Sequence, residues 1–160
     1  MADTTNKEIA QMLLDAVDEE MEESLVIASK IGEDALAISR SEHAYETQTG
    51  NLQSSCGFAL TYNGKIVAET PFTPDTTKHG AAKEGKRKSR PAIPDGETGS
   101  REGKAYLEEC LQDRLEQGIT LTLVAGMEYA GYVEDQGLDV LRSAEEHVRR
   151  EFDKWERGLL

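Results

Sequence analysis

The stretch from Thr49 to Ala68 constrains this chain most, because it joins a strand pattern to a turn signal. Its larger side chains fall on every second position, at Cys56, Phe58, Leu60 and Tyr62. A period of two is typical of a β-strand with one buried face. Asn63-Gly64 then supplies the two positive-φ positions of a type I′ turn, and Lys65–Ala68 returns as the partner strand. We therefore expect an antiparallel hairpin on which the other elements are arranged.

Residues 5–46 carry the longest helical pattern in the chain. Apolar residues recur every three or four positions, at Ile9, Leu13, Val17, Met21, Leu25, Ala28, Ile31, Ala35 and Ile38. An unbroken helix of this length spans roughly 60 Å, and we expect it to bend at Gly32. Because a small sheet covers less apolar surface than this, we expect part of the helix, including Leu25, to pack on another subunit. The alternative is two shorter helices that fold back within one monomer.

Residues 69–101 have a different composition, which predicts a flexible basic loop inserted in the domain. All four prolines of the chain lie there, at Pro71, Pro74, Pro91 and Pro94, and proline opposes both helix and central strand. The stretch 76–94 holds six basic residues against Glu84 alone, a net charge of +5 in a chain whose net charge is −13. The basic residues are Lys78, Lys83, Lys86, Arg87, Lys88 and Arg90.

The second half of the chain predicts two more helices and one more strand. We expect a helix from Ser100 to Gln117, capped by Ser100 and ended by Gly118. Alternating residues predict a strand over Ile119–Val124, and an apolar stripe predicts a last helix over roughly Asp139–Arg157. Helices around a small antiparallel sheet, packed by the long N-terminal helix and the C-terminal helix, define an α+β fold. We expect residues 1–160 to form a single domain.

The segment Ala125–Glu134 echoes the hairpin stretch, with small residues and two tyrosines. We expect it to extend the sheet after a glycine bend at Gly126, so that Tyr129 and Tyr132 fill a seam.

The residue types that carry catalysis do not form a recognisable pattern in this sequence. Cys56 lies in an alternating strand, which favours a core position, and we expect Cys56 and Cys110 to be free thiols. The histidines, His43, His79 and His147, lie in three different elements without a partner at metal-ligand spacing, so we expect each at the surface. The chain predicts no catalytic residue, no cofactor and no metal.

One glycine-rich stretch, residues 80–86, resembles a phosphate-binding loop up to its lysine. The next residue is Arg87, where Mg²⁺ binding requires serine or threonine, and prolines replace the flanking strand and helix. We interpret this stretch as part of the basic loop.

The charge distribution restricts the partners of the chain. Residues 1–46 hold twelve acids and three bases, so most of the surface repels nucleic acid. Three readings of the basic loop stay open: contact with an acidic face of a sister subunit such as Asp18–Glu23, contact with phosphate backbones, and a solvated loop. The loop lacks the interleaved aromatic residues that favour nucleic-acid binding. No apolar run reaches membrane-spanning length and the N-terminus lacks a signal-peptide layout, so we expect synthesis in the cytoplasm and no membrane association.

Two motifs suggest a family. Thr49-Gly50-Asn51-Leu52, followed by Gln53-Ser54-Ser55, comes after a long N-terminal helix, and Tyr129-Ala130-Gly131-Tyr132-Val133-Glu134 comes later. In this order they resemble the minor tail component family of tailed bacteriophages, the tail-completion or head–tail connector proteins of lambdoid type. Gln53 stands where arginine is common in the family, and the basic loop and the helix after it resemble an insertion.

The resemblance implies a structural protein of the virion neck or tail, made in the bacterial host. It implies a homo-oligomeric ring, expected to be hexameric, between the portal-side connector and the tail-tube or tail-terminator proteins, with packaged DNA in its channel. On this reading Thr49–Leu52 leads the chain into the sheet, and Tyr129, Tyr132 and Glu134 lie at or near a subunit seam. Tail-completion, tail-terminator and capsid-proximal roles remain open. The alternative function is a nucleic-acid-binding adaptor that acts through residues 78–90.

Overall fold

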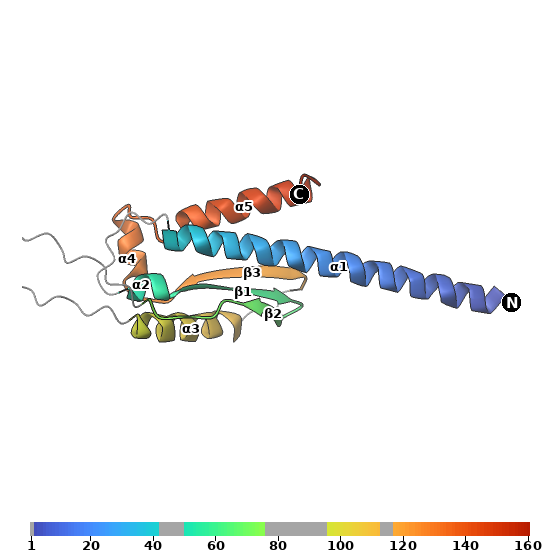
Figure 1. Ribbon diagram of the computed structural model, residues 1–160, viewed down its shortest axis with the longest axis horizontal. Helices are drawn as coiled ribbons and strands as arrows, with labels where there is room; N and C mark the ends of the chain where they lie inside the picture. Colours follow the sequence, from blue (N-terminus) through green and yellow to red (C-terminus); the bar gives the residue numbers. More distant parts are fainter. Residues whose placement is uncertain (1, 42–49, 76–95, 113–116) are drawn as a thin grey trace, which may run out of the picture.

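A computed structural model of the protein describes residues 2–41, 50–75, 96–112 and 117–160. Helices α1 (Ala2–Ser41) and α3 (Glu97–Gln112) cover opposite faces of a three-stranded antiparallel sheet, and α5 (Arg142–Glu156) lies along α1 on the side away from the sheet (Figure 1). The α+β class, with a long N-terminal helix and a C-terminal helix on a small sheet, is confirmed. Within the described residues, no helix is both long enough and apolar enough to cross a bilayer.

Helix α1 runs from Ala2 to Ser41 without interruption. Gly32 therefore does not break the helix, and the alternative of two short helices folded back on each other is wrong. Gly32 has a packing role instead, because a Cβ built on it would lie 2.8 Å from the ring of Phe58 and 3.0 Å from Leu121. The missing side chain lets α1 lie close against the sheet.

The hairpin prediction is confirmed. Strand β1 (Cys56–Tyr62) pairs with β2 (Lys65–Glu69) on one side and with β3 (Ile119–Ala125) on the other, in the order β2-β1-β3. The turn residues Asn63 and Gly64 have φ values of 49° and 76°, as a type I′ turn requires.

Strand β1 is buried on both faces, so the expectation of a single buried face is wrong. Cys56 and Phe58 pack in a cluster with Leu36 of α1, whereas Ala59 packs with Leu107 of α3. The period of two is real, but small residues on the second face accommodate a helix rather than solvent. The hydrophobic core thus has two parts, one above and one below the central strand.

Residues at both ends of the stretch expected to be a loop, residues 69–101, are bonded to the rest of the molecule. Residues 70–75 are held by Thr70, whose N–H donates to Phe58 O at 2.9 Å, and by Asp75, whose N–H donates to Ser54 Oγ at 2.8 Å. Helix α3 begins at Glu97, so Ser100 is not its cap. The Ser100 hydroxyl instead donates to Phe72 O at 2.6 Å, which fixes α3 to this segment.

The segment after β3 is helical, so the expected extension of the sheet through Tyr129 and Tyr132 is wrong. Helix α4 covers Ala130–Asp135, and Tyr129 is its N-cap. Ala130 is buried and Val133 is half-buried, whereas Tyr132 is exposed. Ala130 and Val133 are three residues apart, which is a helical spacing. The segment therefore forms a helix rather than the strand that the two tyrosines suggested.

Candidate interaction surface

The N-terminal part of α1 extends past the body of the molecule. Residues 7–20 are all exposed, and burial begins only near Met21. In Figure 1 this part of the helix runs beyond the hairpin turn and beyond the end of α5. We call residues 7–23 the α1 overhang.

The overhang displays large apolar side chains that nothing in the described chain covers. Their exposed fractions are 51% for Ile9, 71% for Met12, 63% for Leu13, 59% for Leu14 and 58% for Val17. Single exposed apolar residues are common on protein surfaces, but a contiguous patch indicates an interaction site.

The apolar stripe of the overhang continues the face that α1 buries within the molecule. Leu14, Met21, Ala28 and Ala35 follow at intervals of seven residues, which is close to two helical turns. Ala28 and Ala35 are fully buried, whereas Leu14 is exposed. The same face of one helix thus packs on the body over its second half and has no partner among the described residues over its first half. Leu25, expected at a subunit contact, is half-buried where the two halves meet.

The overhang is strongly acidic. Residues 7–23 contain seven carboxylates and one lysine, a net charge of −6. At about 100° per residue, Asp18 and Glu22 flank the apolar stripe on one side and Glu20 flanks it on the other. The surface is therefore an apolar stripe with an acidic rim.

The Thr-Gly-Asn-Leu motif forms the junction between the sheet and α3. Gly50 has a φ of 75°, and α2 (Asn51–Ser54) starts after it. The side-chain carbonyl Oδ1 of Asn51 accepts a hydrogen bond from Gly99 N–H at 3.0 Å, and Leu52 is buried in the core. These residues therefore have a structural role; Thr49 lies outside the described residues.

The sequence analysis did not identify a row of glycines on α3 that lets this helix lie close against α2 and the start of β1. A Cβ on Gly99 would lie 1.9 Å from Asn51 O, and one on Gly103 would lie 2.5 Å from Ser55 O. A spacing of four residues places both on one helix face. That spacing was visible in the sequence, but the composition favoured a loop at the start of this segment.

Gln53 bonds to the end of α1. Its Nε2 donates to Arg40 O, and Arg40 Nη2 donates to Cys56 O at 2.9 Å. Partial burial lowers the pKa of the Arg40 guanidinium. These bonds join the end of α1 to the start of β1.

The residues expected at a subunit seam have different environments. Tyr129 and Tyr132 are 42% and 68% exposed, and partial burial raises the pKa of Tyr129. The carboxylate of Glu134 accepts hydrogen bonds from Leu141 N–H and Arg142 N–H, both at 3.1 Å. Glu134 therefore caps α5 within its own chain, and its role at a seam stays a prediction.

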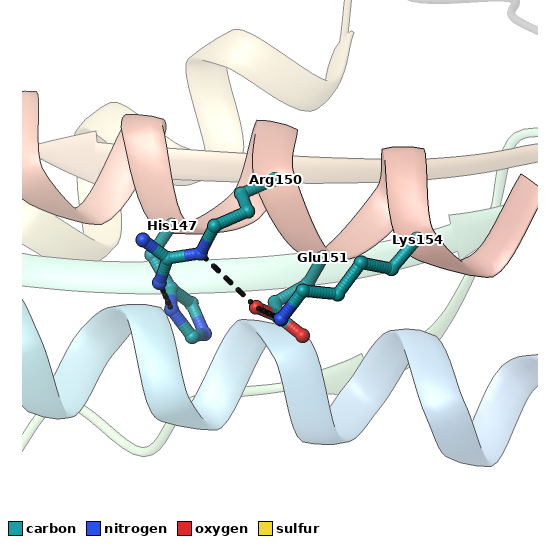
Figure 2. A network of polar contacts seen from close by, with 4 residues as sticks. All are labelled: His147, Arg150, Glu151 and Lys154. Carbon is teal, nitrogen blue, oxygen red and sulfur yellow. Dashed lines mark hydrogen bonds and ion pairs between the residues drawn. The ribbon is translucent and has the colours of Figure 1, made fainter. Parts of the chain in front are cut away.

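A polar network lies on α5, beside α1 (Figure 2). Glu151 accepts from Lys154 Nζ at 2.7 Å and from Arg150 Nε at 3.3 Å, and the Lys154 ammonium lowers the pKa of Glu151. Arg150 Nη2 also lies 3.0 Å from His147 Nδ1. His147 is half-buried, and its Nε2 is enclosed and has no hydrogen-bond partner among the described residues, so this histidine lies only partly at the surface.

The described residues contain no cluster of three or more histidine, cysteine or acidic side chains that could hold a metal ion. Both cysteines are free, and burial raises the pKa of the Cys56 thiol from 9.0 to about 11, so this thiol is a core group. The basic residues from Lys78 to Arg90, together with His43 and His79, lie outside the described residues.

The protein was compared with family models, curated proteins and solved structures. No family model matches the chain, and no curated protein and no solved structure matches it either.

Proposed function

We propose that this chain is a non-enzymatic structural protein of the neck or tail of a tailed bacteriophage, where it joins or seals the head–tail junction as an oligomeric ring. The observation that carries the proposal is the α1 overhang, whose apolar stripe continues the buried face of the helix into solvent. The order of the two sequence motifs supports it, because they resemble the minor tail component family.

The overhang suits assembly rather than catalysis. Large exposed apolar side chains lie along about two and a half turns of helix, from Ile9 to Val17. Covering such a stripe with another protein is favourable, by roughly 25 cal/mol for each Å² of apolar surface removed from water. The proposed partners are further copies of the chain, the portal-side connector and the tail-tube or tail-terminator proteins.

The net charge also suits a channel that passes DNA. A chain with a net charge of −13 repels phosphates over most of its surface, so a channel lined by it would let a genome slide.

The test is the oligomeric state, measured by size-exclusion chromatography with light scattering and by electron microscopy of the particles. We expect the wild-type chain to form rings, alone or with portal and tail proteins. The double variant Leu13→Glu, Val17→Glu should disrupt them. Val26→Glu is the matched control, because Val26 is 69% exposed on another face of the same helix. A wild-type chain that stays monomeric at high concentration and with these partners would refute the proposal.

A further inference from the structure

Strand β3 forms one edge of the sheet. The strand order is β2-β1-β3, so β3 bonds to β1 alone among the described strands. At the two ends of this ladder, Asn63 N–H donates to Gly118 O at 3.0 Å and Gly126 N–H donates to Ser55 O at 3.1 Å. Because hydrogen-bonded pairs alternate along an antiparallel ladder, the N–H and C=O groups of every second β3 residue point away from β1. These residues are Ile119, Leu121, Leu123 and Ala125.

The outward backbone groups of β3 are available for pairing. Among the described residues, none of these groups has a hydrogen-bond partner. The four residues that carry them are half-buried, not enclosed. A strand edge with unpaired N–H and C=O groups is a template for another strand unless the protein protects it.

The two edges of the sheet differ in their protection. Strand β2 has five residues, with Lys65 and Glu69 at its ends and an irregularity in its pairing with β1. Charged side chains, short length and bulges all disfavour pairing between edges. Strand β3 has seven residues in a regular register, and none of them is charged. The β3 edge therefore lacks the protection that the β2 edge has.

We propose that β3 pairs in antiparallel orientation with β3 of a second copy, which joins the two sheets into one. The chain has a net charge of −13, so most of its surface repels another copy. The uncharged β3 edge meets an identical edge without this repulsion. The inference goes beyond the proposed function and does not rest on it, because it follows from the strand edge and uses no residue of the α1 overhang.

A two-fold axis at Thr122 brings all the outward groups into use. This register places Ile119 opposite Ala125 of the second copy and Leu121 opposite its Leu123. Each of the four outward residues then lies in a pair that forms two hydrogen bonds. Leu121 and Leu123 pack against the core cluster beneath α1, so this pairing continues the cluster from one copy into the other.

Thr122 supports this register independently. It is 6% exposed, and its Oγ1 is enclosed without a hydrogen-bond partner among the described residues. In the proposed contact Thr122 lies directly opposite Thr122 of the second copy, and threonines opposite each other in a ladder hydrogen-bond through their hydroxyls. The second copy thus offers a partner to this hydroxyl.

Removal of one outward N–H tests the contact in full-length chains that also carry Leu13→Glu and Val17→Glu, which remove association through the overhang. Ile119→Pro deletes an N–H that β1 does not use, and proline is tolerated at the first residue of a strand. Association measured by analytical ultracentrifugation should weaken about tenfold or more, because each dimer loses two hydrogen bonds. Ile119→Thr is the matched control, since it keeps the N–H, and should stay within about threefold of its parent. Equal association of the two variants would overturn the contact.

Cross-linking tests the register without proline. In a chain with Cys110→Ser, Thr122→Cys sets two thiols opposite each other, with Cα atoms about 4.5 Å apart, a distance that a disulfide spans. Thr120→Cys is the control, because in this register residue 120 lies opposite Val124 of the second copy and away from its own counterpart. Oxidation should yield a covalent dimer on a non-reducing gel with Thr122→Cys alone. Dimers from both variants or from neither would overturn the register.

Two further outcomes separate this contact from the proposed ring. Amides of Leu121 and Leu123 that become protected from hydrogen exchange only when portal or tail proteins are added would overturn self-pairing and assign the edge to one of those proteins. Dimers that form through β3 while no ring forms under any condition would support this contact and refute the proposed function.

Discussion

At the scale of single residues, four glycines decide how closely the helices approach the rest of the chain. Gly32 lies on Phe58, Gly99 on Asn51 and Gly103 on Ser55, and Gly126 lies against Gly103 itself. At Gly99, Gly103 and Gly126 the atom that a Cβ would meet belongs to the backbone, which cannot rotate away as a side chain can. The absence of side chains at these positions therefore allows the close packing between α3, residues 51–55 and the end of β3.

Gly99→Ala should destabilise the protein by about 1–3 kcal/mol, the usual cost of overpacking. The added methyl group would lie 1.9 Å from Asn51 O, so α2 and α3 would have to separate. The matched control is Gly131→Ala in α4, where a Cβ would meet nothing within 4 Å. The control should gain about 0.5–1 kcal/mol. Urea denaturation followed by circular dichroism measures both, and equal midpoints for the two variants would contradict the packing argument.

The Cys56 thiol should make stability depend on pH in alkaline solution. Its pKa is about 11 in the folded protein against 9.0 ordinarily, so between these values the unfolded chain loses its proton first. The folded state then binds more protons, and stability falls as pH rises from 9 to 11, by about 2–3 kcal/mol in all. Below pH 9 this contribution is constant. Cys56→Ala should remove this part of the alkaline dependence and leave that of Tyr129, whose pKa is also raised by burial; thermal unfolding at a series of pH values would show the difference.

At the scale of elements, α5 depends on residues that precede it in the chain. Glu134 accepts from the N–H groups of Leu141 and Arg142, and the Asp139 carboxylate accepts from Ser143 N–H at 3.2 Å. The first N–H groups of a helix have no partner within it, and carboxylates near them also interact favourably with the helix dipole. Helix α4 and the turn after it thus hold the start of α5 in place.

Glu134→Ala should therefore cost about 1 kcal/mol of stability, the usual value for loss of an N-terminal cap. Glu134→Gln keeps an acceptor oxygen at the same place and should cost less. Asp135→Ala, an exposed neighbour in the same helix, is the control and should stay within about 0.5 kcal/mol of wild type. Thermal unfolding measures the stability of the three variants. An equal loss of stability in Glu134→Ala and Asp135→Ala would exclude a capping role for Glu134.

At the scale of the whole molecule, a layered body carries a helix that is longer than the body. Layers of helix enclose the sheet on both sides, and the second half of α1 belongs to this core (Figure 1). The first half has no described tertiary partner. The molecule therefore has a body with a shared core and a helical extension that no described part of the body covers.

Hydrogen exchange should separate these two parts of α1. An isolated helix is marginal in water, so amides of the overhang should exchange much faster than those of residues 28–39, which are packed on the sheet. We expect at least a hundredfold difference at low protein concentration, since local opening costs less than global unfolding. Under conditions of assembly the overhang should become protected. Equal protection of both halves in the monomer would mean that the overhang is covered within its own chain.

The sequence by itself determined the elements whose signals are local. The hairpin and its turn follow from the alternation around Phe58 and from Asn63-Gly64, and α1, β3 and α5 follow from their apolar periods. The close contact between α2 and α3 was indicated in the sequence only by the four-residue spacing of Gly99 and Gly103. The sequence also indicated the overhang, because an apolar stripe longer than a small sheet can cover must end in solvent or on another protein.

Only the tertiary structure decided which surfaces are covered. Whether β1 has one buried face or two depends on α3, which lies about forty residues further along the chain. The helical conformation after β3 depends on a core that accepts Ala130 and Val133, and the bond from Ser100 to Phe72 depends on a segment 28 residues earlier in the chain. Local patterns fix backbone conformation because turn and helix energies act over a few residues. Burial is settled by elements distant in sequence, so it is known only once they are packed together.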